Sequence, residues 1–151
     1  MLQPVAHILL QVRESVLALV DGLAPAQWNE RPAGVASVGF HVQHITGVVD
    51  RLFAYARGDA LTPAQFVMLR AEGDALPPDE IPVALGAMAA RIDAAVAELR
   101  SIDVATLADF RGVGRAQLPS TVIGCLVHGA EHAMRHVGQL SVTARVVRAQ
   151  S

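Results

Sequence analysis

Apolar residues recur at intervals of three and four positions in four long stretches, and this periodicity constrains the fold more than any other feature. A helix turns by about 100° per residue, so this spacing places the apolar side chains on one face. The stretches cover about residues 4–22, 37–57, 79–99 and 120–147. Four such faces are buried when the helices pack against each other. We therefore expect an all-α four-helix bundle.

The residues at the ends of these stretches are typical of helix termini. Gly22 and Gly58 follow the first two stretches, and a glycine there can take the left-handed conformation that ends a helix. Ser37 can cap the second helix, and Ser120 or Thr121 can cap the last one. The sequence thus predicts the helices and candidate residues for several of their ends, although the pattern does not fix the first residue of the second helix.

The connection between the second and third predicted helices covers residues 58–78. It is far longer than a turn between antiparallel neighbours, and long enough to return along the whole bundle. We therefore expect these two helices to run parallel. A short helix is expected inside the connection, with Thr62 as its cap and Pro63 at its first position. Residues 101–119 are expected to form an irregular connection.

Composition limits the function classes and the compartment. Hydrophobic residues make up 52% of the chain and aromatic residues 4%, which predicts a core of small aliphatic side chains in one domain over residues 1–151. The net charge is −2 without a basic block, so no nucleic-acid partner is expected. No apolar run reaches the ~20 residues of a membrane span, and the N-terminus lacks signal-peptide features. The lone cysteine, Cys125, suits a reducing compartment, which predicts a cytoplasmic protein.

Three of the six histidines, His128, His132 and His136, follow each other at four-residue intervals in the last stretch. Four residues turn a helix by about 40° net, so His132 and His136 project from one stripe and can share an ion. His128 to His136 spans about 12 Å, which is too far for all three to bind one ion easily. In the second stretch, His44 lies in the apolar register and is expected to point inward. His41 precedes it by three residues and could lie beside it.

An inward His44 that faces His132 and His136 predicts a site for one divalent ion such as Zn²⁺ or Ni²⁺. Three protein ligands leave one position open to water or substrate, as in catalytic zinc sites. The alternative is that each histidine is a buried residue held by a hydrogen bond. The spacing alone does not choose between these interpretations.

Three nearby residues allow more than one role. His128 and Glu131 are candidates for contacting the metal ligands from outside, although Glu131 can equally be solvated. Residues 128–132 match the His-x-x-Glu-His pattern of inverted zinc peptidases, but no acidic residue follows to supply their further ligand. We therefore reject the peptidase. Cys125 is interpreted as a small core residue and not as a nucleophile.

Three parts of the chain carry a resemblance to a known family: Trp28, Ser37 with His44 seven residues later, and the ending His128-x-x-x-His132-x-x-x-His136-x-Gly138-Gln139. Together they resemble the DinB-like (DinB/YfiT) superfamily over nearly the whole chain. The resemblance implies an up-down-down-up four-helix bundle, commonly a homodimer. It also implies one divalent metal ion bound by three histidines, which correspond here to His44, His132 and His136.

The resemblance further implies a class of reaction. Some relatives are S-transferases or isomerases that use a low-molecular-weight thiol such as bacillithiol, mycothiol or glutathione, with a small-molecule substrate. A divalent ion in the predicted site would activate either a thiol or a water molecule. We therefore expect a metal-dependent thiol S-transferase or isomerase. The alternatives are a metal-dependent hydrolase and a non-enzymatic metal-binding module of the stress response.

Overall fold

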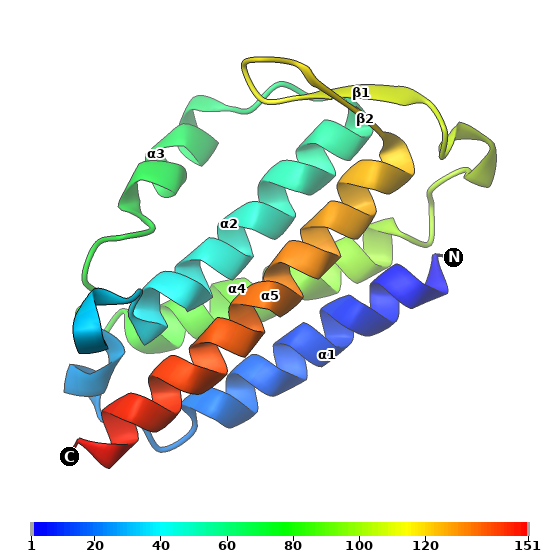
Figure 1. Cartoon of the computed structure of the whole chain (residues 1–151). Coiled ribbons are helices and arrows are strands. Elements are labelled where there is room, and N and C mark those ends of the chain that lie inside the picture. Colours follow the sequence, from blue (N-terminus) through cyan, green and yellow to red (C-terminus); the bar gives the residue numbers. More distant parts are fainter. Residues whose placement is uncertain (1, 151) are drawn as a thin grey trace.

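Four long helices form a bundle in the computed structural model, which describes residues 2–150. They are α1 (Gln3–Val20), α2 (Val38–Arg57), α4 (Ile81–Glu98) and α5 (Val122–Ala149). Helices α1 and α5 run in one direction, and α2 and α4 run in the other (Figure 1). The predicted all-α, up-down-down-up bundle is confirmed. The observed helix ends lie within about two residues of the expected ones.

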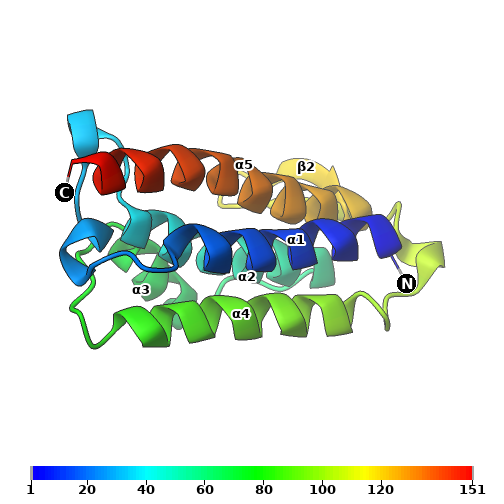
Figure 2. The same cartoon turned by 90° about the horizontal axis from the view of Figure 1, so that it is seen from below.

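The helices pack in a ring, in which α2 and α1 each contact both α4 and α5. Figure 2 shows α1 lying between α4 and α5 on one face of the bundle. The core between them is aliphatic, with Leu9, Ile45, Ile92 and Leu126 fully buried. Gly129 of α5 lets α2 approach closely, because a Cβ there would lie 3.4 Å from Leu52 Cβ. Helices α2 and α5 therefore lie close together, and they carry the candidate site.

The predicted caps hold the ends of α2 and the start of α5. The hydroxyl of Ser37 accepts a hydrogen bond from the backbone N–H of Phe40 at 3.1 Å. Gly58 takes a left-handed conformation, with φ at 84°, where α2 ends. At α5 the capping residue is Thr121, whose hydroxyl accepts from the N–H of Gly124 at 3.1 Å. These local bonds satisfy backbone groups that a helix end leaves unpaired.

The long connection between α2 and α4 contains helix α3 (Pro63–Ala71), as the sequence predicts. The side chains of Thr62 and Gln65 form a capping box at its start. The connection runs back along the bundle beside α2, which allows α2 and α4 to be parallel (Figure 1). No residue of α3 is buried, so α3 covers the bundle from outside.

The connection before α5 differs from the prediction of an irregular segment. It contains an antiparallel hairpin of strands β1 (Phe110–Val113) and β2 (Leu118–Thr121). The strands have four residues each, and they pair Gly112 with Pro119, two residue types that are rare in strands. Their local sequence therefore carries little strand signal. The hairpin is held by a tertiary contact, in which Arg111 Nε donates to the carbonyl of Ala56 at 2.8 Å.

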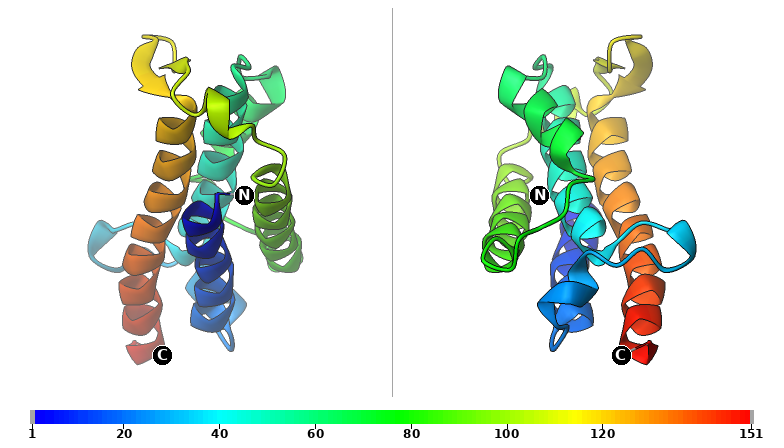
Figure 3. Two further views of the ribbon diagram at one scale, coloured as in Figure 1. Left: turned by 90° about the vertical axis from the view of Figure 1, so that its right-hand side faces the viewer. Right: turned by 90° about the vertical axis from the view of Figure 1, so that its left-hand side faces the viewer.

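Three short 3₁₀ turns complete the described elements: η1 (Pro25–Trp28), η2 (Pro32–Gly34) and η3 (Val104–Thr106). Trp28, the only tryptophan of the sequence, is 2% exposed and belongs to the core. The hairpin lies at the end of the bundle opposite to the C-terminus (Figure 3). Within residues 2–150, no helix is both long and apolar enough to cross a membrane.

Candidate metal centre

Helices α2 and α5 bring three histidine side chains together: His44, His132 and His136. The Nε2 atom of His132 lies 3.1 Å from that of His44 and 3.2 Å from that of His136. All three candidate ligand atoms lie within 4.8 Å of each other, and none of the three residues is exposed. The i, i+4 pair and the inward His44 therefore meet as the sequence predicts. Three imidazole nitrogens that face a common point are a suitable donor set for a divalent ion.

A buried ion pair orients His44 from outside the cluster. The Oε2 atom of Glu72 lies 2.7 Å from His44 Nδ1, and Glu72 Oε1 accepts from Arg51 Nη1 at 2.5 Å. Glu72 is 5% exposed and Arg51 is 9% exposed. A carboxylate at Nδ1 places the imidazole proton there and leaves Nε2 free to act as a ligand, an arrangement typical of zinc-binding histidines.

The electrostatics of Glu72 favour the ionised form that this role requires. Burial alone would raise the pKa of Glu72. The hydrogen bonds from His44 and Arg51, together with their charges, outweigh burial and lower that pKa below its ordinary value. The carboxylate is therefore charged at neutral pH and can hold the Nδ1–H of His44.

A fourth histidine, His41, supports His136 in the same manner. The Nδ1 atoms of His41 and His136 are 3.0 Å apart. Only one of them can carry the shared proton, so His136 keeps a free Nε2 when its own Nδ1 donates. Burial lowers the pKa of His41 to about 4, with a further effect from His44. Burial, followed by the neighbouring histidines, also lowers the pKa of His136 to about 4. Neutral imidazole is the form that binds metal.

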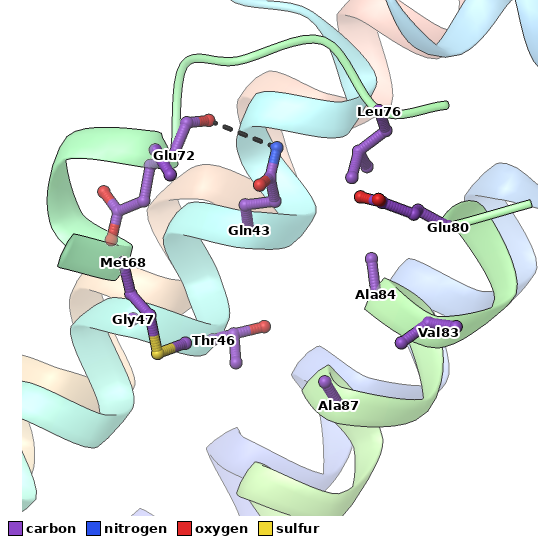
Figure 4. Close-up of a pocket in the computed structure, with 11 residues that line it drawn as sticks. Gln43, Thr46, Gly47, Met68, Glu72, Leu76, Glu80, Val83, Ala84 and Ala87 are labelled. Carbon is purple, nitrogen blue, oxygen red and sulfur yellow. Dashed lines mark hydrogen bonds between the residues drawn. The ribbon is translucent and has the colours of Figure 1, made fainter. Parts of the chain in front are cut away.

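Gly47 makes room for the ion pair over α2. A Cβ at this position would lie 2.1 Å from Glu72 Oε1 and 2.5 Å from Arg51 Nη1. Any other residue would displace one of the two partners. The side chain of Gln43 also holds this segment, since its amide donates to the carbonyl of Glu72 at 3.4 Å and to that of Asp74 at 3.2 Å (Figure 4).

The sequence interpretation missed Glu72, Arg51 and Gly47 and left His41 open. A partial signal was present in α2, where a glycine and an arginine interrupt the apolar face three and seven residues after His44. No local pattern marks Glu72, because it lies in the turn that follows α3 and reaches His44 across 28 positions.

The other candidate residues of α5 lie at the edge of the cluster or away from it. His128 is exposed, and its ring centroid is 5.7 Å from that of His132. Glu131 is exposed and accepts hydrogen bonds from Arg135, the shortest at 2.6 Å. Cys125 is buried beside the hydroxyl of Ser120. The hydrogen bonds to the cluster from outside thus come from Glu72 and His41.

Two cavities lie beside α2 near the histidine cluster. The larger, about 800 Å³, lies between α2, α3, the hairpin turn and α5, and His44, His128 and His132 line it. The smaller, about 380 Å³, lies between α2, α3 and α4, and Glu72 lines it (Figure 4). The histidine cluster therefore has one side that opens into a cavity large enough for a small organic molecule.

Comparison with known proteins places this arrangement in a family. The model of the DinB superfamily matches residues 8–140 of the chain. The chain belongs to the DinB superfamily. Members of this superfamily often bind metal, which agrees with the three histidines that converge in this DinB chain. Their assignment as metal ligands stays a prediction.

The same architecture occurs in a solved structure. The chain is similar to a conserved protein from Enterococcus faecalis, with a TM-score of 0.76 and 21% sequence identity. The match covers 97% of this chain and 96% of that protein. At this identity the similarity establishes the DinB fold alone. No curated protein matches the chain.

Replacing Glu72 tests whether the outer contacts support a metal site. We expect Glu72→Gln to weaken zinc binding about 10- to 100-fold, because the oxygen of a neutral amide accepts the Nδ1–H of His44 more weakly than a charged carboxylate does. Competition with a fluorescent chelator measures the affinity. The exposed Glu80 lines the other cavity and gives a matched control, since Glu80→Gln should bind zinc like the unmodified chain. Equal affinities of the two variants would contradict a role of Glu72.

Proposed function

We propose that this DinB superfamily chain is a metal-dependent enzyme that acts with a low-molecular-weight thiol, as an S-transferase or an isomerase. One observation carries the proposal. The three histidine Nε2 atoms converge at the wall of a cavity of about 800 Å³, and two of the histidines, His44 and His132, line that cavity. Reactants in the cavity can therefore reach the position where an ion would be held.

The donor set supports the metal part of the proposal. His44, His132 and His136 would hold one divalent ion such as Zn²⁺ or Ni²⁺, and their neutral imidazoles match the preference of these ions. When bound, the ion acts as a Lewis acid that favours loss of a proton from a thiol or from water. Three protein ligands leave room for such a molecule.

The surrounding residues supply orientation and an apolar lining. Glu72 and Arg51 fix the imidazole of His44, and His41 fixes that of His136. Apolar side chains of α2 and α3, including Leu52 and Phe66, line the cavity and reduce its water content. His128 lines the same cavity and is exposed, so its imidazole can pass a proton from a bound thiol to solvent. The sulfur would then form a bond to an electrophilic carbon of the substrate as the bond from that carbon to its leaving group breaks, and the leaving group departs with the electron pair of the broken bond.

A thiol-conjugation assay with a chromophoric electrophile tests this function. We expect turnover to require both the divalent ion and the added thiol. Cys125→Ser should keep this activity, because Cys125 is buried and the attacking sulfur comes from the co-substrate. Loss of turnover in Cys125→Ser at unchanged metal content would place the nucleophile in the chain and contradict the mechanism.

The same assay separates the alternative functions. Turnover of an ester or amide without added thiol would identify a hydrolase. Stoichiometric metal without turnover of any such substrate would favour a non-enzymatic binding module. The cytoplasmic location, the homodimer, the small-molecule substrate and the single domain stay predictions from the sequence.

A further inference from the structure

The walls of the larger cavity are mostly apolar and are partly open to solvent. Val48 and Leu52 of α2 form one wall, and Phe66 and Leu69 of α3 form the opposite one. Phe66 is 41% exposed and Leu69 is 40% exposed. A ligand with an apolar body would cover these side chains and remove their surface from water, at about 25 cal/mol for each Å².

The charge of the cavity has one sign. Two arginines, Arg51 and Arg115, line it, and none of the described residues that line it is acidic. The charge of Arg51 is offset by Glu72, which lies behind it. Arg115 differs, because it is exposed and no ion pair to it occurs among residues 2–150. Its guanidinium is therefore available to a ligand.

The hairpin turn places Arg115 at the mouth of the cavity. Gly114, directly before it, has φ at 70°, and Gln117, two positions after it, has φ at 50°, so the chain reverses tightly here. Gly114 and Gln117 line the cavity as well.

We propose that the cavity binds a molecule with an apolar body and one anionic group, and that Arg115 binds the anionic group. A carboxylate, sulfonate or phosphate suits a guanidinium, which can donate two parallel hydrogen bonds. This inference rests on the proposed function, because it names the class of substrate that the same site would take. The binding itself does not require turnover.

A pair of fluorescent probes tests the inference. Anilinonaphthalene sulfonate combines an aromatic body with a sulfonate, and N-phenylnaphthylamine has the same body without the charge. We expect Arg115→Gln to weaken binding of the sulfonate roughly fivefold to tenfold, the size of one charge-assisted contact near the surface. Binding of the neutral probe should not change. Fluorescence titration of the purified full chain measures both affinities.

Two further variants identify the place of binding. Arg70 is exposed on α3 beside its apolar residues, so Arg70→Gln controls for adsorption of the probe to the outside of that helix. Ala60 is exposed and lines the cavity, so Ala60→Trp should obstruct it and weaken both probes. Equal effects of Arg115→Gln and Arg70→Gln, or unchanged binding in Ala60→Trp, would overturn the inference.

The titrations are carried out with chelator and again with zinc. An effect of Arg115→Gln in both conditions supports the anion site even if the thiol assay shows no turnover. Zinc-dependent turnover in the thiol assay, together with a sulfonate affinity that Arg115→Gln does not change, would overturn the anion site and leave the proposed function intact. The two proposals therefore fail separately.

Discussion

The His132→Ala variant is expected to lose nearly all of its divalent metal and to keep its helical structure. His132 lies at the centre of the cluster, since its Nε2 is 3.1 Å from that of His44 and 3.2 Å from that of His136. A structural zinc contributes about 10–16 kcal/mol over four ligands, so loss of one imidazole weakens binding roughly hundredfold or more. Elemental analysis of the purified protein should give about one ion per chain before the change and almost none after it.

Helical circular dichroism checks that this variant still folds, and alanine is the residue most favourable to a helix. The His128→Ala variant is the matched control, because His128 is exposed one turn earlier on the same helix. It should retain most of the metal. Stoichiometric metal in His132→Ala would rule out the predicted ligand set. An equally complete loss in His128→Ala would make His128 a ligand.

The metal-free protein is expected to lose stability as the pH falls from about 6.5 to about 4. Burial lowers the pKa of His41 from 6.5 to about 4 in the folded chain. The unfolded chain therefore binds a proton first as the pH falls, so unfolding becomes more favourable across this window. Above pH 6.5 the contribution of His41 to stability is fully present. For this residue, which is 2% exposed, the effect is roughly 3 kcal/mol.

Urea unfolding at several pH values in the presence of chelator measures this dependence. His41→Gln removes the titrating group and should flatten the profile, although His136 still contributes. His7 is exposed on α1, so His7→Gln should reproduce the original profile. Added zinc should move the loss of stability to lower pH, because it competes with protons for the imidazoles. An unchanged profile in His41→Gln would contradict the assignment.

Much of the fold could be predicted because it depends on short-range patterns. Three- and four-residue spacing of apolar side chains determines which face of each helix is buried, whatever that face packs against. The caps at Ser37 and Thr121 act within three residues of their own position. The length of the segment that contains α3 was sufficient to indicate that α2 and α4 run parallel.

The histidines of the candidate site could be predicted for the same reason. A four-residue step on a helix brings His132 and His136 together without any tertiary information. The register of α2 indicated that His44 points inward, and the family resemblance joined it to the pair. The pair of His132 and His136 is the part of the site that helix geometry alone can relate.

Only the tertiary structure decided what surrounds the histidines. Glu72 reaches His44 from a turn whose path depends on how α3 lies along α2, and helix periodicity does not encode that path. His41 meets His136 because α2 and α5 pack at one particular rotation and offset. The hairpin that brings Arg115 to the cavity is held by its contact with the end of α2 and not by the propensity of its residues. The sequence by itself thus determined the helices and the spacing of the histidines along them. Long-range packing determined the orienting contacts and the cavity, because these join segments with no local relation to each other.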